Sequence, residues 1–282
     1  MSRLFGLFTH ASMPVSPLLR LAGDRVSISA IKNRDGYGLG YAQGGEMLLQ
    51  RRPQLRGQAI DLAKVAADIR STAFLCHVRQ AEVGGQNFEN TQPFRFGSWI
   101  FAQTGTLPGG TALYDSIREQ LPDSIARSIA GETDAELFFH LFLSRLHDEG
   151  VSPRHWAVDL PLVARALGHT VTAWRALGRV SQARSDAPIE VALLLTNGQS
   201  FFAFTHGRPL WWAAVRSTPR DFVDLELSLK SPSGEAVVGV PGAVVVIDGD
   251  EAPAGGFFRP IPPHTMLCVD RDLRVSWGPA AL

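Results

Sequence analysis

Two charged residues have side chains that could bind a small molecule carrying both a carboxylate and an ammonium group. Arg79 follows an apolar run, and a guanidinium can bind a carboxylate through two parallel hydrogen bonds. Asp134 stands at the start of an expected helix, where a negative charge is favoured, and it could still present an oxygen to an ammonium. Simpler roles stay open for both: a surface or interface salt bridge for Arg79, and a helix cap for Asp134.

Other short motifs in the chain do not amount to a site. The glycines of residues 36–40 (GYGLG) lack the spacing of a dinucleotide-binding loop, and no helical pattern follows them. We interpret them as positions where another backbone approaches a strand closely. Residues 29–32 (SAIK) match a catalytic S-x-x-K pattern without its companion motifs, and no G-x-S-x-G elbow occurs. The eight histidines are scattered without zinc-ligand spacing, so we expect neither a metal nor a cofactor.

Five further motifs carry a more specific signal because they occur in a fixed order along most of the chain. They are residues 2–6 (SRLFG), 35–40 (DGYGLG), 77–94 (beginning HVRQAEVG and ending NFENTQPF), 131–136 (GETDAE) and 193–212 (beginning LLLTNGQ and ending LWW). In this combination the chain resembles the class II glutamine amidotransferases, and in particular the small, stand-alone branch of that family. Asn87 and Asn90 in the third motif are expected to form turns rather than to bind a ligand.

The resemblance implies an α+β fold of the N-terminal-nucleophile hydrolase type. Such a fold is a four-layer αββα sandwich of two antiparallel sheets, which we expect to form a single domain over residues 1–282. In such proteins the initiator methionine, here Met1, is removed. Residue 2 then attacks the side-chain amide of glutamine, and its own α-amine serves as the base.

The resemblance also assigns roles to individual residues. By position, Arg79 matches the arginine that holds the substrate carboxylate, and Asp134 matches the acid that holds its α-ammonium. Gly105 matches one donor to the oxyanion of the tetrahedral intermediate. His77 and Thr133 belong to the same motifs, and we expect them to line the substrate site.

Two positions depart from the family pattern. The family nucleophile is a cysteine, whereas this chain has Ser2, whose hydroxyl is far less acidic and depends on its base. An α-amine can serve as that base, since its pKa is roughly 7.7–8.0. Where family members carry His-Asn-Gly, this chain has Gln103, Thr104 and Gly105. Loss of the asparagine donor costs about 2.7–4 kcal/mol of transition-state stabilisation, unless the shorter Thr104 hydroxyl replaces it.

These departures leave three functions open. The first is weakened amide hydrolysis of glutamine or a γ-glutamyl compound by Ser2. The second is a catalytically inactive family member, a pseudoenzyme, that binds such a ligand or acts as a scaffold for a partner enzyme. The third is a structural subunit with a vestigial pocket. Beyond about residue 215 only short strands are expected, so any released ammonia would be used by a partner enzyme in trans, or the reaction would be simple hydrolysis.

Apolar periodicity predicts the elements that must position these residues. Helices are expected at residues 58–70, 133–147 and 160–177, and Thr133 and Glu136 have the spacing of a capping box. Strands are expected at residues 4–8, 25–30, 38–42, 47–50, 73–78, 98–102, 243–247, 266–269 and 274–277, with a glycine turn at residues 44–45. Residues 191–196, 200–204 and 210–215 indicate a β-meander. This order of strands, helices and strands favours α+β layers.

The composition narrows the classes of partner. The chain has 282 residues, with 27 basic and 27 acidic side chains and a net charge of zero, which argues against nucleic acid as the main partner. Its longest apolar runs are interrupted by glycine and proline and are shorter than the ~20 residues of a membrane-spanning helix. The count of two cysteines argues against a disulfide scaffold. We therefore expect a cytoplasmic protein without nucleic-acid or membrane partners.

Overall fold

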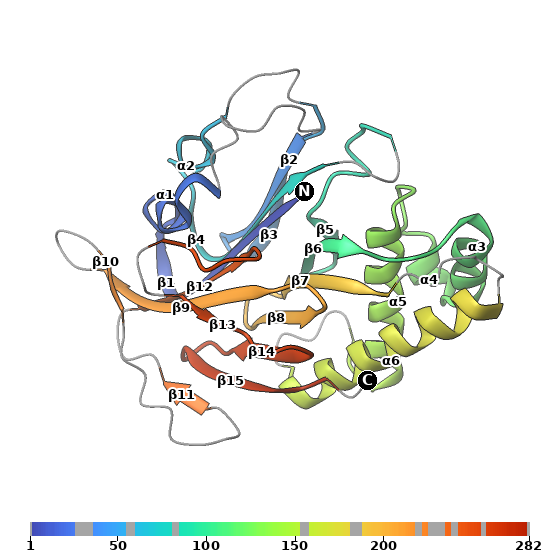
Figure 1. Ribbon diagram of the computed structural model, residues 1–282. Helices are drawn as coiled ribbons and strands as arrows, with labels where there is room; N and C mark the ends of the chain where they lie inside the picture. The colour runs from blue at the N-terminus through green and yellow to red at the C-terminus, as the bar shows by residue number, and fades with distance from the viewer. Residues whose placement is uncertain are drawn as a thin grey trace.

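The strands of the chain form two antiparallel sheets in the computed structural model (Figure 1). The structure describes residues 2–25, 36–54, 60–80, 85–152, 158–180, 188–217, 222–224, 235–237, 242–254 and 258–280. Within these residues the two sheets lie face to face, and helices cover the outer side of each sheet.

The N-terminal strand lies inside the first sheet rather than at its edge. The strand order is β10-β9-β12-β1-β4-β2-β3, and β13 pairs with β9 beside this path. The strands are β1 (Arg3–Pro14), β2 (Gly36–Gln43), β3 (Glu46–Arg52), β4 (Arg70–Arg79), β9 (Leu210–Ser217), β10 (Phe222–Asp224), β12 (Gly242–Asp248) and β13 (Arg259–Pro260). Because β1 pairs with both β4 and β12, its first residues are held from two sides.

The second sheet has the order β11-β15-β14-β8-β7-β6-β5. Its strands are β5 (Phe94–Phe96), β6 (Trp99–Thr106), β7 (Glu190–Thr196), β8 (Phe201–His206), β11 (Glu235–Val237), β14 (Thr265–Val269) and β15 (Arg274–Pro279). The strand β6, which carries the Gln103-Thr104-Gly105 segment, pairs with β5 and β7.

Alternate residues of the central strands fill the space between the two sheets. Leu4 and Phe8 of β1, Leu75 of β4, Ile100 of β6 and Val246 of β12 are all buried in this inner cluster. Side chains alternate between the two faces of a strand, so the residues two positions further along each strand also point into this space. This periodicity decides which side chains meet at the ends of the sandwich.

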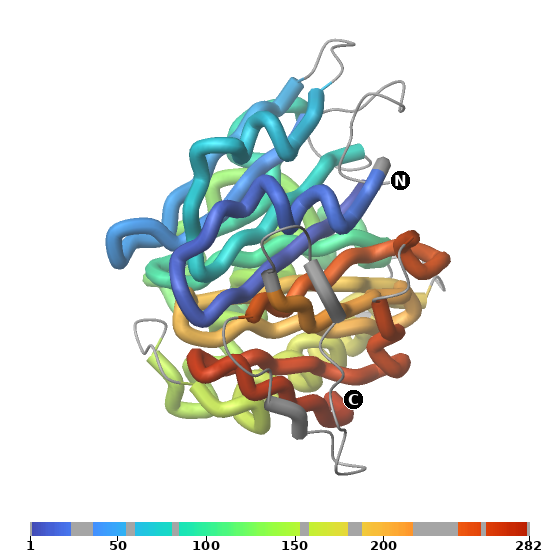
Figure 2. The backbone as a smooth tube through the Cα atoms, turned by 90° about the vertical axis from the view of Figure 1, so that its left-hand side faces the viewer, coloured from blue at the N-terminus to red at the C-terminus, as the bar shows by residue number. Residues whose placement is uncertain are grey.

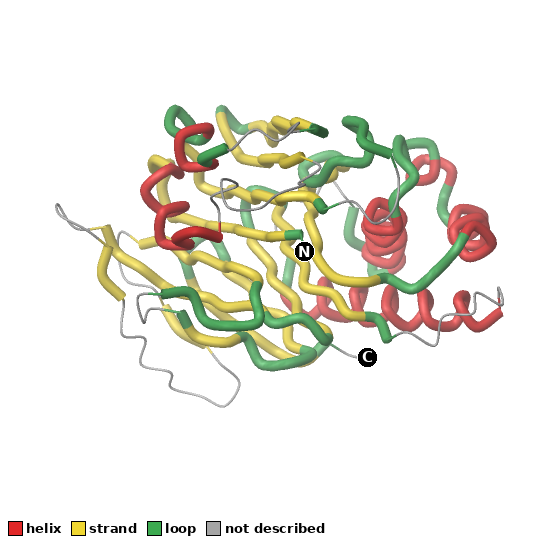
Figure 3. Tube along the Cα trace, turned by 45° about the horizontal axis from the view of Figure 1, so that its top comes forward, coloured by secondary structure: helices red, strands yellow, loops and turns green. Residues whose placement is uncertain are grey.

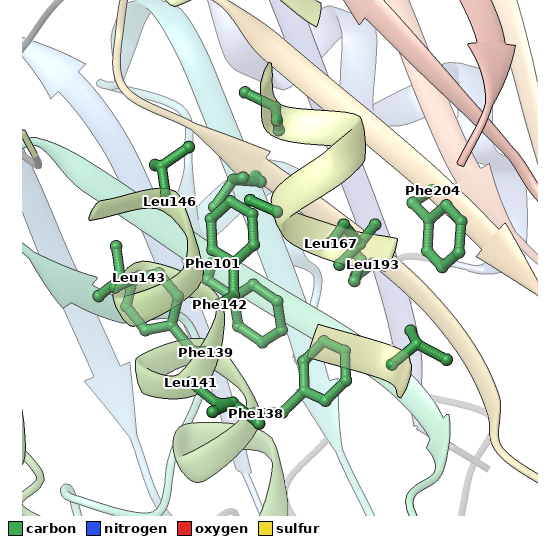
Figure 4. Close-up of a cluster of buried hydrophobic side chains, with 14 of the residues drawn as sticks. Phe101, Phe138, Phe139, Leu141, Phe142, Leu143, Leu146, Leu167, Leu193 and Phe204 are labelled. Carbon is green, nitrogen blue, oxygen red and sulfur yellow. The ribbon is translucent and has the colours of Figure 1, made fainter. Parts of the chain in front are cut away.

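The outer faces of the sheets are covered by two groups of helices (Figure 1). One group consists of α1 (Val15–Leu19), the 3₁₀ helix η1 (Arg20–Arg25) and α2 (Leu62–Val65) on the first sheet. The other consists of α3 (Thr111–Gln120), α4 (Asp123–Ala126), α5 (Asp134–Asp148) and α6 (Leu160–Val180) on the second. Figure 4 shows the aromatic and leucine side chains of this second interface. There Phe139 of α5 stacks on Phe101 of β6, with ring centroids 5.0 Å apart.

The expected fold class is therefore confirmed: the molecule is an α+β sandwich of two antiparallel sheets with a helical layer on each side. The helices expected at residues 133–147 and 160–177 correspond to α5 and α6. The glycine turn between β2 and β3 also forms, since Gly44 and Gly45 both have positive φ, at 63° and 83°.

Three expectations about elements need correction. The helix expected at residues 58–70 is wrong over residues 60–70, where only Leu62–Val65 is α-helical, because Asp61 caps its start and β4 begins at Arg70. Residues 58 and 59 lie outside the described residues. The predicted β-meander is wrong in its third strand, because β9 pairs with β12 in the first sheet, whereas β7 and β8 pair with each other in the second. Of the strand expected at residues 25–30, Arg25 ends η1 and residues 26–30 lie outside the described residues.

Candidate functional site

The inward-facing positions of the sandwich change from apolar to polar at one end. On β4 the buried Leu75 is followed at two-residue steps by His77 and Arg79. On β6 the apolar positions end at Thr104, and on β12 they end at Asp248. Ser2 immediately precedes β1. Because β1 and β12 both pair within one sheet and β6 belongs to the other, strand periodicity brings these polar groups to a common end.

The N-terminal end of β1 lies between the two groups of helices, in the middle of the view in Figure 3. Figure 2 shows the same end from the side, next to the end of β4. The strand register agrees, since Arg3 pairs with Val78.

A cavity of about 210 Å³ opens at this end of the sandwich. It is lined by the three residues expected in catalysis, Ser2, Thr104 and Gly105, and by the four expected to bind substrate, His77, Arg79, Thr133 and Asp134. The structure thus brings together all seven residues, which come from the position before β1, from β4 and β6, and from the start of α5. The cavity is smaller than the about 300–1,000 Å³ of sites for drug-sized ligands, so it suits a molecule the size of an amino acid.

The Ser2 hydroxyl is held by the backbone of Gln80. The Gln80 N–H donates to Ser2 Oγ over 3.0 Å, and Ser2 Oγ donates to the Gln80 carbonyl over 3.3 Å. An N–H aimed at Oγ stabilises negative charge that develops on that oxygen. Sequence reasoning did not find Gln80, because a backbone donor has no signature in residue type.

Arg79 is buried at the end of β4, with 4% of its surface exposed. Its guanidinium donates to the Gly85 carbonyl over 2.9 Å, and the Asn90 side chain donates to the same oxygen over 3.1 Å. Asn90 Oδ1 also accepts from the Glu132 N–H, so Asn90 connects the segment after β4 to the segment before α5. Asn87 forms the expected turn by accepting from the Asn90 N–H. Arg79 is therefore buried and hydrogen-bonded to the backbone, and does not lie on the exposed surface.

The start of α5 positions Asp134 and Thr133. Thr133 is the N-cap, and its side chain accepts from the Glu136 N–H over 3.2 Å. The expected capping box is only half formed, because the buried Glu136 carboxylate accepts from the N–H groups of Ala130 and Gly131 instead of that of Thr133. Asp134 Oδ1 accepts from the Ala135 N–H over 2.8 Å. Asp134 therefore belongs to the helix start and also lines the cavity.

The Gln103-Thr104-Gly105 segment borders the cavity along β6. Gly105 has φ +118°, and a Cβ there would lie 1.9 Å from the Glu190 carbonyl oxygen, so this position requires glycine. The Gln103 N–H donates to Gln92 Oε1 over 2.6 Å. Gln92 lies beside Gly38, where a Cβ would be 2.0 Å from the Gln92 carbonyl oxygen. This close approach confirms the interpretation of the glycines in β2.

Asp248 is a buried acid beside the site that sequence reasoning missed. Its Oδ1 accepts from the Leu4 N–H over 2.7 Å, and Thr104 Oγ1 lies 3.3 Å from its Oδ2. Burial raises the pKa of Asp248 to about 6, against the opposing effects of the Leu4 N–H, the Arg208 charge, the Thr104 hydroxyl and the Arg3 charge. The available signal was a charged residue directly after the apolar residues 243–247.

A second cavity of about 280 Å³ is also lined by Ser2. Its lining includes Arg3, Arg208, Asp250 and Glu251, and both Ser2 and Arg208 line the two cavities. Arg208 lies in the connection between β8 and β9. Ser2 thus borders two polar cavities.

Within the described ranges, no group of three or more His, Cys, Asp or Glu side chains is placed to hold a metal ion. In the same part of the chain, no helix is both long and apolar enough to cross a membrane.

Comparison with solved structures supports the fold. The class-II domain protein of Silicibacter pomeroyi, described as a glutamine aminotransferase, superposes with a TM-score of 0.63 at 16% identity, covering 99% of this chain and all of that one. Glutamine phosphoribosylpyrophosphate amidotransferase from B. subtilis superposes with a TM-score of 0.56 at 16% identity, covering 99% of this chain and 49% of that one. At these identities the likeness concerns the fold alone.

Comparison with protein sequences goes further. The probable glutamine amidotransferase DUG3 of Saccharomyces cerevisiae is 26% identical over 172 residues, which are 57% of this chain and 47% of that protein. The chain thus spans about half the length of this relative. Residues 1–231 match the family model described as class-II glutamine amidotransferases, and this match covers most of the chain. The motifs, the sandwich and the family match agree, and the chain belongs to the class-II glutamine amidotransferase family.

Proposed function

We propose that the protein binds glutamine or a γ-glutamyl compound and slowly hydrolyses its side-chain amide, with Ser2 as the nucleophile. The observation that carries this proposal is the single cavity lined by a nucleophile, a buried guanidinium and a carboxylate. In this proposal Arg79 binds the α-carboxylate of the ligand and Asp134 binds its α-ammonium. These two contacts orient the γ-carbonyl toward Ser2.

The nucleophilic step requires a free α-amine on Ser2, and therefore removal of Met1. The amine accepts the hydroxyl proton while Ser2 Oγ forms a bond to the amide carbon. It then gives this proton to the leaving nitrogen as the carbon–nitrogen bond breaks, so that ammonia or an amine departs into the second cavity. Water attacks the resulting ester, the amine again relays the proton, and glutamate leaves.

Stabilisation of the oxyanion is the weak point of this site. The Gly105 N–H and the Thr104 hydroxyl are the proposed donors. A missing donor costs about 2.7–4 kcal/mol, which corresponds to a rate loss of about 10²–10³-fold. Serine in place of cysteine lowers the rate further. We therefore propose turnover well below that of a family member with both usual groups.

One observation favours the alternative of a catalytically inactive, ligand-binding subunit for a partner enzyme. Thr104 Oγ1 lies 3.3 Å from the buried carboxylate of Asp248, so the hydroxyl has an acceptor other than an oxyanion. In this alternative the cavity senses its ligand, and any chemistry belongs to the partner.

The two functions are distinguished by measuring binding and turnover on the same preparation. Intact mass first selects protein that has lost Met1. Glutamate release from glutamine and from a γ-glutamyl anilide is then followed in the wild type and in Ser2→Ala and Ser2→Cys. Hydrolysis predicts release in the wild type, more in Ser2→Cys and none in Ser2→Ala. The inactive alternative would be established if calorimetry shows that glutamine binds while neither the wild type nor Ser2→Cys releases glutamate.

Arg79→Lys tests the substrate contact, because lysine keeps the charge and loses the bidentate fork. We expect ligand affinity to fall by at least tenfold. Arg70→Lys is the matched control on the same strand: Arg70 lies at the opposite end of β4, is exposed and does not line the cavity. Equal effects of the two substitutions would argue against the proposed carboxylate site.

A further inference from the structure

Asp248 connects the nucleophile strand to the proposed oxyanion donor. It is 5% exposed at the end of β12, and its two oxygens have different neighbours. Oδ1 accepts from the N–H of Leu4, two residues after Ser2, and Oδ2 lies 3.3 Å from Thr104 Oγ1 in the opposite sheet. A single carboxyl group thus spans from one sheet to the other beside the cavity.

The Thr104 hydroxyl has one proton to donate. An ionised carboxylate is an acceptor only, so opposite an ionised Asp248 this proton is directed to Oδ2 and not toward the cavity. A protonated carboxyl group can instead donate to Thr104 Oγ1. The hydroxyl then accepts from Asp248, and its own proton can be donated to a ligand oxygen.

We propose that Asp248 is a positioning residue that sets the direction of the Thr104 hydroxyl, withholding this donor from the oxyanion when ionised and releasing it when protonated. The inference rests on the proposed hydrolysis. It explains why a chain that retains the substrate-binding residues would turn over slowly near neutral pH.

The charged groups around Asp248 are compatible with both protonation states. Arg3 of β1 and Arg208 of the turn before β9 favour the carboxylate, whereas burial disfavours it more strongly and raises its pKa to about 6. Burial, together with the charge of Asp248, raises the pKa of the Cys76 thiol of β4, which therefore stays neutral. Ionisation of Asp248 thus falls within the range where activity can be assayed.

Asp248→Asn is the decisive variant because asparagine copies the protonated acid. Its Oδ1 can keep accepting from the Leu4 N–H, while its NH₂ donates to Thr104 Oγ1. With a pKa of about 6, about 3% of Asp248 is protonated at about pH 7.5. We therefore expect kcat in Asp248→Asn to exceed that of the wild type by up to about 30-fold at that pH, and the ratio of the two kcat values to increase as the pH rises above about 6.

Thr104 supplies the controls for this experiment. The gain in Asp248→Asn is expected to vanish when it is combined with Thr104→Val and to persist with Thr104→Ser, which retains a hydroxyl. A wild type that turns over while Asp248→Asn shows no gain would overturn the proposal. So would a gain that survives Thr104→Val.

A measurement without turnover separates this inference from the proposed function. The pKa of Asp248 is followed by carboxyl-carbon NMR in the wild type and in Thr104→Val. Loss of the donated hydroxyl is expected to raise this pKa, and an unchanged pKa would overturn the proposal even in an inactive protein. Absence of turnover in the wild type, Asp248→Asn and Ser2→Cys would refute the proposed function, and with it the oxyanion role of Thr104.

Discussion

Asp248→Asn also tests the burial of this carboxyl group through stability alone. The pKa of Asp248 is about 6 in the folded protein and 3.8 for an unperturbed aspartate. One pKa unit corresponds to about 1.36 kcal/mol, so the difference of about two units corresponds to about 3 kcal/mol. The folded state binds the proton more tightly. This contribution to stability is therefore fully present below about pH 3.8 and is lost as the pH rises to about 6.

The expected result is a pH-dependent difference in the free energy of unfolding between Asp248→Asn and the wild type. Asparagine cannot ionise, so Asp248→Asn lacks this pH dependence. Its free energy of unfolding, relative to the wild type, should increase by about 2 kcal/mol between about pH 4.5 and about pH 7.5, because part of the titration is already complete at the lower pH. Urea unfolding with linear extrapolation at several pH values provides the measurement.

Asp68→Asn is the matched control, because Asp68 is exposed just after α2 and undergoes the same chemical change. Its stability relative to the wild type should stay nearly constant over this pH range. If Asp248→Asn behaves like Asp68→Asn, the carboxyl group is not desolvated as the structure indicates, and the argument for its protonation near neutral pH fails with it.

Further predictions concern the supports of the site. Gly105→Ala should destabilise the fold by at least about 3 kcal/mol in thermal unfolding, because positive φ and a carbonyl clash act together, whereas Gly44→Ala, with positive φ and open space, should cost only about 1–2 kcal/mol. A smaller loss at Gly105 than at Gly44 would contradict this. Phe139→Ala should cost about 3–5 kcal/mol in urea unfolding because it leaves a cavity against Phe101. Glu136→Ala should lower the free energy of unfolding by about 1–3 kcal/mol, because it leaves the N–H groups of Ala130 and Gly131 without their acceptor. It should also lower the affinity for glutamine measured by calorimetry, because these residues lie just before Asp134. An unchanged affinity would show that this contact does not support the ligand site.

Much of the fold follows from the sequence where local signals agree with tertiary packing. The residues of α5 and α6 have helical periodicity over several turns, and the strands at residues 4–8 and 73–78 are short apolar runs. The prediction of a helix at residues 58–70 was wrong because apolar residues such as Ile60 and Ile69 can be buried on one side of a segment that is not helical. The prediction that residues 210–215 complete the meander was wrong because proximity in the sequence does not determine which sheet a strand joins.

The sequence by itself determined the family and seven candidate residues, because motifs such as that around Arg79 preserve residue type and order. Only the tertiary structure decided that Asp248 stands beside Leu4 and Thr104, since 244 residues separate it from Leu4 and 144 from Thr104. The physical reason is that strand pairing and alternation of side chains, not proximity in the chain, determine which groups share a buried end of the sandwich. The consequences for Thr104 follow from that placement.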